Sequence, residues 1–582
     1  MKKSIILVAI LIVVLAFSMV LVACGNEDNV SHTCVDGNSD HTCDSCNTII
    51  PCRDNDKNHN CDICNKEWTQ CFDNNSDHNC EICGKTITTC RDNNNDHNCD
   101  ICNEKTPCID DNKDHICDLC EDILTCADKN ENGICDVCGA VLNIENMTYD
   151  GSAVTIKFYH TMGGALSSLL SEYIVEFNAL YPNIKVETSQ NGGYDDLKAQ
   201  IATEINVGGQ PNIAYCYPDH VALYNVTGAV VSLDSFINCT ATIERADGTT
   251  ETIGLTDAQK ADFIQGFYNE GKQFGDGMMY TMPFSKSTEV LYYNKTFFEE
   301  HNLSVPTTWE EMEALCAKIK EIDPNCIPLG YDSEANWFIT MCEQLGSPYT
   351  SAEEGNHFLF DNAKNKEFVK MFREWHKKGY VTTQEIYGSY TSGLFTAKAG
   401  SQRCYMCIGS SAGASYQAPK IDENTNDYPF EVGIAGIPQV NANNPKVISQ
   451  GPSLCIFGKE NPQEVIASWL FVKFLTTNKD FQAEFSMASG YVPVLKSVGD
   501  NPKYAEFLAK ADGGAYISAL SAKVCLEQKD AYFTPPAFND SSIARVEVGA
   551  LMNKCLSEET SDVDALIDQA FADAIEECEN NS

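Results

Sequence analysis

The chain has 582 residues, 30 of them cysteine, and its 83 acidic and 40 basic residues give a formal net charge of −43 at pH 7. One hydrophobic core does not grow to that length, so we expect several compact units. The excess of negative charge opposes binding to nucleic acid or to an anionic lipid surface and favours cationic partners.

Residues 1–23 have the pattern of an export signal peptide. Lys2 and Lys3 precede an unbroken apolar run that stops at Cys24. The stretch LVACG that contains this cysteine resembles the lipobox of bacterial lipoproteins, which implies that Cys24 is lipidated and becomes the new N-terminus. Residues 24–33 would then tether the chain to the outer face of the cell membrane. A retained transmembrane helix is the alternative, because the run approaches the roughly 20 residues that span a bilayer.

Residues 34–138 contain six repeats, which recur every 18 or 19 residues and hold 18 of the cysteines. Each repeat has a cysteine, eight residues and a C-x-x-C pair, with oxygen-bearing side chains at alternate positions in between. In the first and last repeats these side chains are Asp36, Asn38, Asp40, Asp44, Asp128, Asn130, Asn132 and Asp136. Units so small and so poor in apolar residues need metal ions or disulfides for their stability.

The repeats are open to three interpretations, each of which predicts a mechanical or adhesive spacer. Alternating Asp and Asn followed by another acid is how a calcium loop collects oxygen ligands, and the repeats resemble thrombospondin type 3 and dockerin-like loops. The turn position of such a loop is glycine only in the last repeat, at Gly133, and histidine in the others. The cysteines and that histidine could instead bind zinc. In an exported region the cysteines could also pair into a disulfide-bonded stalk.

Ordinary globular composition begins after a linker at residues 139–149, so we expect residues 150–582 to form the main body. Residues 154–159 alternate as in a β-strand, residues 166–177 have helical periodicity, and residues 184–187 have the pattern of a second strand. A strand, a helix and a strand in this order predict an α/β layer.

Four stretches of the body carry a family resemblance: FYHTMGGALSSLLSEYIVEFNALYPNIKV, GGQPNIAYCYPDHVALYNVTGAVVSLDSFI, YTMPFSKSTEVLYYNKTFFEEHNLSVPTTWEEME and SMASGYVPVLKSV. The third is the most specific, because an apolar strand ending in YYNK leads to a TWEE helix start. The chain resembles the extracellular solute-binding proteins (family 1) of ABC importers, in the group that takes up sugars and glycerol phosphates. The resemblance implies a two-lobed α/β fold of the periplasmic-binding-protein kind, with a hinge. It also implies a small-molecule solute, ABC permease subunits as partners, no cofactor and no enzymatic activity.

The same resemblance implies where the solute is held. The residues at the contact positions of the glycerol-3-phosphate-binding members are Tyr194, Ser287, Ser410 or Ser411, Gly451, Tyr491 and Arg545. These residues suit a phosphate, because a guanidinium offers two parallel donors, and hydroxyls and backbone N–H groups add more.

The contact to the glycerol hydroxyls departs from the family pattern. The family's acidic residue aligns with Pro218, and the nearest carboxylate is Asp219. Trp337 and Tyr217 could instead stack on a sugar ring, which is the usual mode of the sugar-binding relatives. The expected solute is therefore glycerol-3-phosphate, a glycerophosphodiester or a sugar.

The remaining eleven cysteines, from Cys216 to Cys578, are scattered and often flanked by apolar residues, so we expect most of them to fill the core. Cys404 and Cys407 have C-x-x-C spacing but lie in a strand-like stretch. The sequence contains no Walker loop, no H-E-x-x-H and no G-x-S-x-G. Two other functions remain as alternatives to solute capture: surface adhesion or display through the repeats, and hydrolysis on a similar α/β frame.

Overall fold

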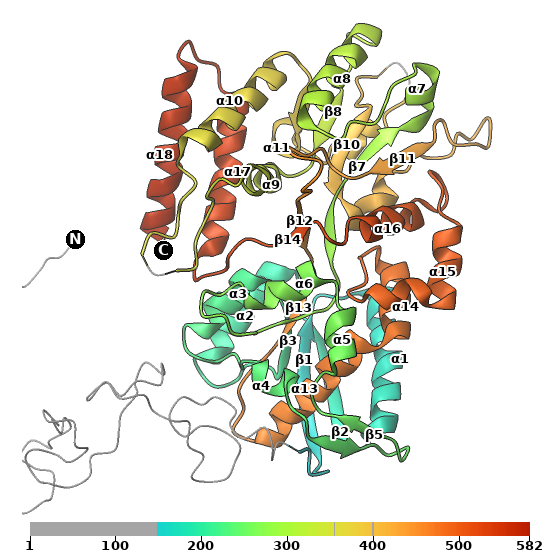
Figure 1. The fold of residues 1–582 in the computed structure, drawn as a ribbon, viewed down its shortest axis with the longest axis vertical. Helices are drawn as coiled ribbons and strands as arrows, with labels where there is room; N and C mark the ends of the chain where they lie inside the picture. The colour runs from blue at the N-terminus through green and yellow to red at the C-terminus, as the bar shows by residue number, and fades with distance from the viewer. Residues whose placement is uncertain (1–147, 354, 399–400, 582) are drawn as a thin grey trace, which may run out of the picture. The chain divides into compact units, whose positions relative to one another are not determined.

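The computed structural model describes residues 148–353, 355–398 and 401–581. These residues belong to the second of two compact units into which the chain divides, and they form the coloured ribbon of Figure 1. The predicted signal peptide, the predicted lipidation site Cys24, the repeats with their predicted metal ligands and most of the linker lie outside the described residues.

Two β-sheets divide the body into two lobes. The first lobe contains a five-stranded sheet in the order β2-β1-β3-β13-β6. Its strands are β1 (Val154–His160), β2 (Ile184–Gln190), β3 (Ile213–Cys216), β6 (Met282–Pro283) and β13 (Ser453–Ile456). β1 pairs in parallel with β2 and β3, and β13 runs antiparallel to β3 and β6. Alternate side chains of β1 are buried, which is the alternation that predicted this strand.

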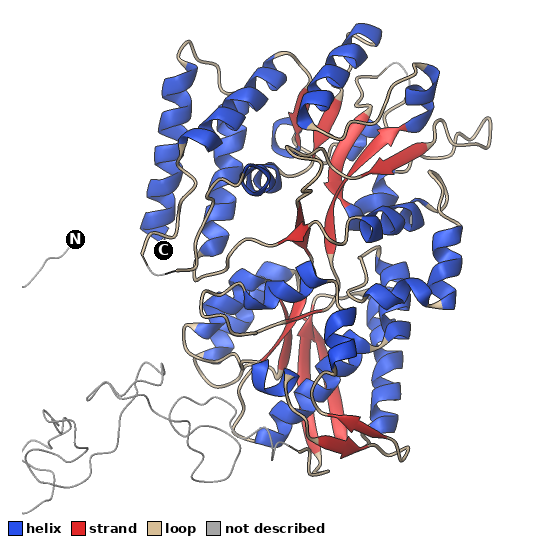
Figure 2. Cartoon of the chain, in the orientation of Figure 1, coloured by secondary structure: helices blue, strands red, loops and turns tan. Residues whose placement is uncertain are grey.

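Helices lie on both sides of the first sheet (Figure 2). They are α1 (Gly164–Leu180), α2 (Tyr194–Ile205), α3 (Pro218–Asn225), α4 (Asp234–Ile237), α5 (Asp257–Asp262), α6 (Gln265–Asn269), α13 (Pro462–Thr477) and α14 (Lys479–Ser489). Two short 3₁₀ helices, η1 (Glu270–Lys272) and η3 (Lys496–Asp500), and a small hairpin of β4 (Thr242–Glu244) and β5 (Thr250–Thr252) complete the lobe.

The second lobe is built on β7 (Ser287–Asn294), a strand that is buried along nearly its whole length. The sheet order is β14-β12-β7-β10-β8-β9, and β11 also pairs with β7. The other strands are β8 (Leu329–Tyr331), β9 (Val381–Thr383), β10 (Met406–Ser410), β11 (Val432–Ala435), β12 (Val447–Gln450) and β14 (Tyr532–Phe533). A strand with neighbours on both edges and helices over its faces needs a continuous apolar run, and VLYY supplies it.

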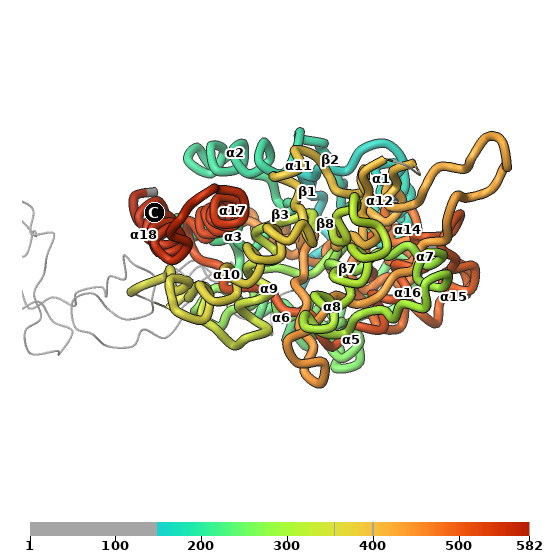
Figure 3. The backbone as a smooth tube through the Cα atoms, turned by 90° about the horizontal axis from the view of Figure 1, so that it is seen from above, coloured from blue at the N-terminus to red at the C-terminus, as the bar shows by residue number. Residues whose placement is uncertain are grey.

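The helices of the second lobe include α8 (Trp309–Ile322), which begins at a capping box between Thr308 and Glu311, as the TWEE pattern predicted. The others are α7 (Lys295–Glu300), α9 (Glu334–Leu345), α10 (Ala363–Lys377), α11 (Gln384–Tyr387), α12 (Ser392–Phe395), η2 (Ser411–Gln417), α15 (Pro502–Ala509), α16 (Ile517–Glu527), α17 (Ser541–Ser557) and α18 (Val563–Asn581). α10, α17 and α18 pack against one another at one side of this lobe (Figures 1 and 3).

Two crossing segments connect the lobes side by side. The first leads from β6 to β7, and the second leads back from β12 to β13. Gly451 lies on the second crossing with φ +93°, and a Cβ at this position would lie 2.4 Å from the carbonyl oxygen of Ser285 on the first. Only glycine permits both this backbone conformation and this close approach. A third connection leads through α15 to α16, which packs on the second sheet. Short connections between two lobes with separate sheets are the arrangement of a hinge.

The predicted two-lobed α/β architecture is confirmed. All eleven cysteines of the body are buried, including Cys404 and Cys407 on either side of the start of β10, and burial raises the pKa of both thiols. This agrees with a packing role. Among the helices that the structure describes, none is long and apolar enough to cross a membrane.

Candidate functional site

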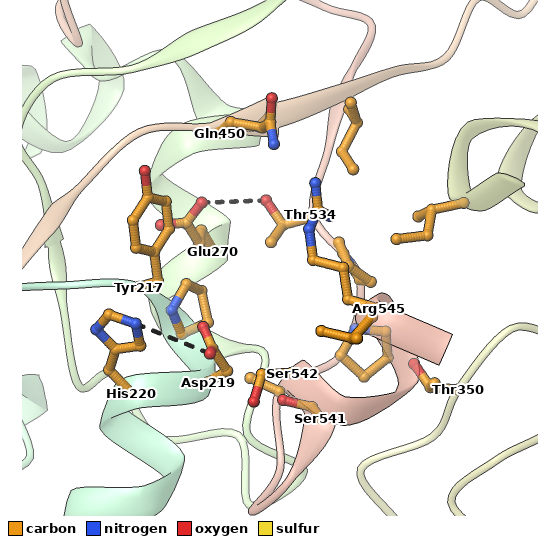
Figure 4. A pocket seen from close by; sticks show the side chains of 18 of the residues that line it. Tyr217, Asp219, His220, Glu270, Thr350, Gln450, Thr534, Ser541, Ser542 and Arg545 are labelled. Carbon is orange, nitrogen blue, oxygen red and sulfur yellow. Dashed lines mark hydrogen bonds and ion pairs between the residues drawn. The ribbon is translucent and has the colours of Figure 1, made fainter. Parts of the chain in front are cut away.

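A cavity of about 440 Å³ lies between the two lobes. Its first-lobe wall comes from the starts of α2 and α3 and from η1, and its second-lobe wall comes from β12, α17 and the loops that follow α9 and β14. Figure 4 shows Arg545 reaching into this space from α17, opposite Tyr217 and Glu270. Because both lobes supply walls, a molecule in this cavity would contact both.

The local sequence explains the first-lobe wall. Tyr194 is the first residue of α2, and the backbone N–H of Gly193 before it donates to the Asp196 carboxylate at 2.9 Å. Pro218 occupies the first position of α3, where its missing N–H costs no helical hydrogen bond. Asp219 follows in the first turn, where the helix dipole favours a negative charge.

Tyr194 and Tyr217 supply hydroxyl groups to the cavity wall on this side, and Tyr491, which is set back from the wall, neighbours Tyr194. The rings of Tyr194 and Tyr217 meet edge to face with their centroids 5.0 Å apart. Burial raises the pKa of Tyr194 to about 12 and also raises the pKa of Tyr217 and that of Tyr491. All three hydroxyls are therefore protonated at neutral pH, and those of Tyr194 and Tyr217, which line the cavity, are able to donate to an anion.

Arg545 supplies the guanidinium of the cavity. Its Nη2 donates to Oδ1 of Asn336, and the amide of Asn336 donates to Oε1 of Gln450 at 3.0 Å. These contacts orient the guanidinium, whose fork of N–H groups matches the oxygens of a carboxylate or phosphate.

Four buried polar atoms of the cavity wall have no hydrogen-bond partner among the described residues. They are Nδ1 of His220, the hydroxyl of Tyr349, Oγ1 of Thr350 and Oγ of Ser449. Burial lowers the pKa of His220, so its ring is neutral at pH 7, although Oδ2 of Asp219 lies 3.9 Å from Nε2. Unpaired buried polar atoms cost free energy, and a hydrogen-bonding occupant would remove that cost.

Glu270 joins the cavity wall to the hinge. It forms a buried ion pair with Lys286 of the first crossing segment. It also accepts hydrogen bonds from Ser453 Oγ at 2.7 Å and from Thr534 Oγ1 at 3.2 Å. One carboxylate thus contacts three separate segments that run between the lobes or along the cavity.

The structure brings together some of the predicted solute contacts. Those that line the cavity are Tyr194, Asp219 and Arg545, with Tyr217 beside them. Ser410 lines a second cavity in the second lobe. Those that are buried or set back from both cavities are Ser287, Ser411, Gly451 and Tyr491. The Ser411 hydroxyl accepts a hydrogen bond from the backbone of Thr288 at 3.1 Å, which gives this serine a structural role.

The prediction for Trp337 is wrong. This side chain has 0 % exposure, and its ring stacks on Tyr331 with the centroids 4.7 Å apart and the planes at 13°. The ring of Phe372 also packs against Trp337, with the two ring centroids 4.0 Å apart. Trp337 is therefore a core residue of the second lobe, where no sugar ring could stack on it.

Sequence reasoning missed several residues of the cavity wall: Glu270, Tyr349, Thr350, Ser449, Gln450 and Thr534. Ser449 and Gln450 directly precede Gly451 in the SQGPSL stretch, so that motif could have indicated them as residues of the cavity wall. The others lie in a short 3₁₀ helix or in loops, where no periodicity or motif marks them.

These features define a two-lobed binding protein with a cavity at the hinge. The family model described as "Bacterial extracellular solute-binding protein" matches residues 172–511, which is more than half of the chain. The chain belongs to this family of bacterial extracellular solute-binding proteins.

Similar curated proteins place the chain within that family. The sn-glycerol-3-phosphate-binding periplasmic protein UgpB of Escherichia coli K12 is 25 % identical over 379 residues, covering 62 % of this chain and 79 % of the relative. UgpB of Escherichia coli O1:K1 is 25 % identical over 389 residues, covering 64 % and 81 % respectively.

Solved structures share the fold. The cyclic α-maltosyl-1,6-maltose-binding protein of Arthrobacter globiformis has a TM-score of 0.57 at 19 % identity, covering 74 % of this chain and 100 % of its own. UgpB of Mycobacterium tuberculosis in complex with glycerophosphocholine has a TM-score of 0.56 at 18 % identity, covering 74 % and 98 %. The chain is thus a substrate-binding protein of the ABC importer type, related in sequence to UgpB, and it shares its fold with sugar-binding proteins.

The described residues hold no group of three or more His, Cys, Asp or Glu side chains that could bind a metal ion. The predicted calcium or zinc ligands of the repeats lie outside them.

Proposed function

We propose that the body captures glycerol-3-phosphate or a glycerophosphodiester between its lobes and delivers it to the permease subunits of an ABC importer. The observation that carries this proposal is Arg545, which projects into an interlobe cavity whose wall also presents unpaired polar atoms. The sequence relationship to UgpB supports the same class of solute.

The phosphate would lie against the Arg545 guanidinium, which offers two parallel N–H donors. The hydroxyls of Tyr194 and Tyr217 face the same space from the first lobe and would donate to the remaining oxygens. Asp219 would accept from the glycerol hydroxyls in place of the acidic residue that the family carries at the position of Pro218. A phosphate held this way would join the two lobes and favour the closed state of the hinge.

We also propose that the chain is a lipoprotein with no enzymatic activity. Cys24 would carry the lipid anchor, residues 34–138 would act as a spacer stabilised by calcium and disulfides, and residues 150–582 would bind the solute at the outer face of the membrane. The mass of the mature N-terminal peptide tests the anchor, since a peptide that begins at acylated Cys24 is expected and an unprocessed Met1 would contradict it.

Thermal unfolding of the purified chain against a panel of solutes tests the main proposal. The panel comprises glycerol-3-phosphate, glycerophosphodiesters and mono- and oligosaccharides. A ligand at a hundred times its Kd stabilises a protein by about 2.7 kcal/mol, so we expect a clear rise in Tm with the phosphates.

The variant Arg545→Ala should lose this rise, because no other arginine of the described residues lines the cavity. Arg403→Ala, which removes an arginine elsewhere in the second lobe, is the matched control and should keep it. A rise with sugars alone would leave solute binding in place but refute a phosphate ligand. No rise in Tm with any compound would contradict the proposed solute binding and favour adhesion through the repeats.

A further inference from the structure

A second cavity, of about 500 Å³, lies within the second lobe. Its wall includes Glu289 of β7, Asp332 and Asn336 beside or within α9, Ser410 and Gln417 around η2, and Gln450 of β12. Gln450 also lines the interlobe cavity, so the two spaces share a wall. We refer to the second space as the acidic cavity.

The acidic cavity has two carboxyl groups in its wall and no basic side chain beside them among the described residues. Glu289 and Asp332 line it, and no lysine, arginine or histidine does so among the described residues. Glu289 is fully buried and accepts hydrogen bonds from Tyr331 at 2.7 Å and from the Asn336 amide at 3.0 Å. Burial raises the pKa of both carboxyl groups. The carboxylate of Asp332 is costly to enclose without a cation beside it, and a ligand with a positive charge would reduce that cost.

Asp332 keeps one oxygen available. Its Oδ1 accepts from the backbone N–H of Thr391 at 2.6 Å and from the Thr391 hydroxyl at 2.7 Å. Its Oδ2 has only a weak contact to the thiol of Cys407, at 3.8 Å. This oxygen can therefore accept a further hydrogen bond from an occupant of the cavity.

Gln417 has a buried acceptor atom that receives no hydrogen bond from the described residues. The side chain is 3 % exposed, and its Nε2 contacts the same Cys407 sulfur at 3.3 Å. Its Oε1 is buried and has no hydrogen-bond partner among the described residues. The Gln417 amide and Asp332 Oδ2 thus flank one thiol, and both acceptors lack a strong donor.

The mouth of the cavity carries two exposed aromatic rings. Tyr390 is 63 % exposed and Tyr416 is 77 % exposed, and both line the acidic cavity. Tyrosine faces attract cations through the ring quadrupole. The rings therefore favour the same sign of ligand charge as the carboxylates do.

We propose that the acidic cavity binds a primary ammonium group of the solute, so that the whole cleft selects a zwitterion with its phosphate at Arg545 and its ammonium at Asp332 and Gln417. This inference rests on the proposed function, because it uses the same cleft. Asn336 connects the two parts, since it contacts Glu289, Gln450 and Arg545.

The acceptors distinguish an ammonium from other groups. A neutral hydroxyl could donate to Gln417 but would leave the carboxylate charge uncompensated. A quaternary ammonium would supply the charge but has no N–H to donate to Gln417 Oε1. A primary ammonium has three N–H donors and the charge, so it satisfies both requirements.

Calorimetric titration of the purified chain tests this proposal with four probes. They are glycerol-3-phosphate, glycerophosphoethanolamine with a primary ammonium, glycerophosphocholine with a quaternary one, and glycerophosphoinositol with an uncharged polyol. We expect glycerophosphoethanolamine to bind at least tenfold more tightly than the other three. In Asp332→Asn and in Gln417→Leu this preference should fall at least fivefold, while the Kd for glycerol-3-phosphate stays within twofold.

Asp530→Asn, at an exposed carboxylate that lines neither cavity, is the matched control and should behave as the wild type. The Tm of each unliganded variant checks that it folds. Equal binding of all four probes, or an equal loss for all of them in Asp332→Asn, would overturn the ammonium site while leaving phosphate binding in place. Absence of binding by glycerol-3-phosphate and by every other probe would overturn the proposed function together with it.

Discussion

At the scale of single residues, Glu289 is a carboxyl group whose protonation is coupled to the stability of the second lobe. It is fully buried on β7, and burial raises its pKa to about 7 despite the hydrogen bonds from Tyr331 and Asn336. The positive charge of Arg545 partly opposes this increase, and the neighbouring Asp332 adds to it. The folded state therefore holds a proton at Glu289 that the unfolded chain releases near pH 4.5.

This coupling predicts a specific pH dependence for Glu289→Gln. Because the folded pKa is raised, the stabilising contribution of the protonated group is complete below about pH 4.5 and is lost as pH rises through about 7. The free energy of unfolding of the wild type relative to Glu289→Gln should fall across this window, by an amount of order 3 kcal/mol. Urea unfolding at pH 5, 6, 7 and 8 measures the difference, and a constant difference would contradict the raised pKa.

At the scale of elements, the crossing segments are held by the buried pair of Glu270 and Lys286. Lys286 also donates to the carbonyl oxygen of Gly451 at 2.9 Å, so it connects the two adjacent crossings. Glu270 accepts from Ser453 and Thr534, which brings a third segment to the same point. Glu270 also lines the interlobe cavity, so one carboxylate contacts both the cavity and the crossing segments.

Removal of one partner of this pair should destabilise the body strongly. Lys286→Met leaves Glu270 buried without its cation, and such a loss costs about 3–5 kcal/mol. The double variant Lys286→Met with Glu270→Gln removes the uncompensated charge and should recover at least half of that cost. Denaturant unfolding of the wild type, both single variants and the double variant gives the coupling energy. Additive effects of the two substitutions would show that the pair is not coupled.

At the scale of the whole molecule, the two lobes are built on separate β-sheets, joined by short connections next to a cavity with walls from both. A solute that bridges the walls adds contacts that exist only when the lobes are close together. Binding and closure are therefore parts of one equilibrium, and the solute favours the closed state by its differential affinity for it.

Hydrogen exchange of the purified chain tests this bridging directly. With saturating ligand, amides should exchange more slowly at the start of α2 and α3 in the first lobe and in α17 in the second. Arg545→Ala at the same ligand concentration is the control and should show no slowing in either lobe. Slowing confined to one lobe would mean that the solute binds there without bridging.

The helices and strands near the start of the body, and the resemblance to the solute-binding family, were predictable from the sequence. Each of them depends on residues that are close together in the chain. Alternation gave β1, helical periodicity gave α1, and the capping pattern placed the start of α8. Arg545 and Tyr194 were also predicted for the site, and both line the interlobe cavity.

Only the tertiary structure decided which residues share a wall. Glu270 contacts Lys286, Ser453 and Thr534, the last of which lies 264 residues away in the chain, and no local pattern encodes such contacts. The same reason explains Trp337, since burial depends on Tyr331 and Phe372 from other elements rather than on its own sequence context. Local periodicity determines helices and strands through contacts a few residues apart. The cavities depend instead on long-range packing.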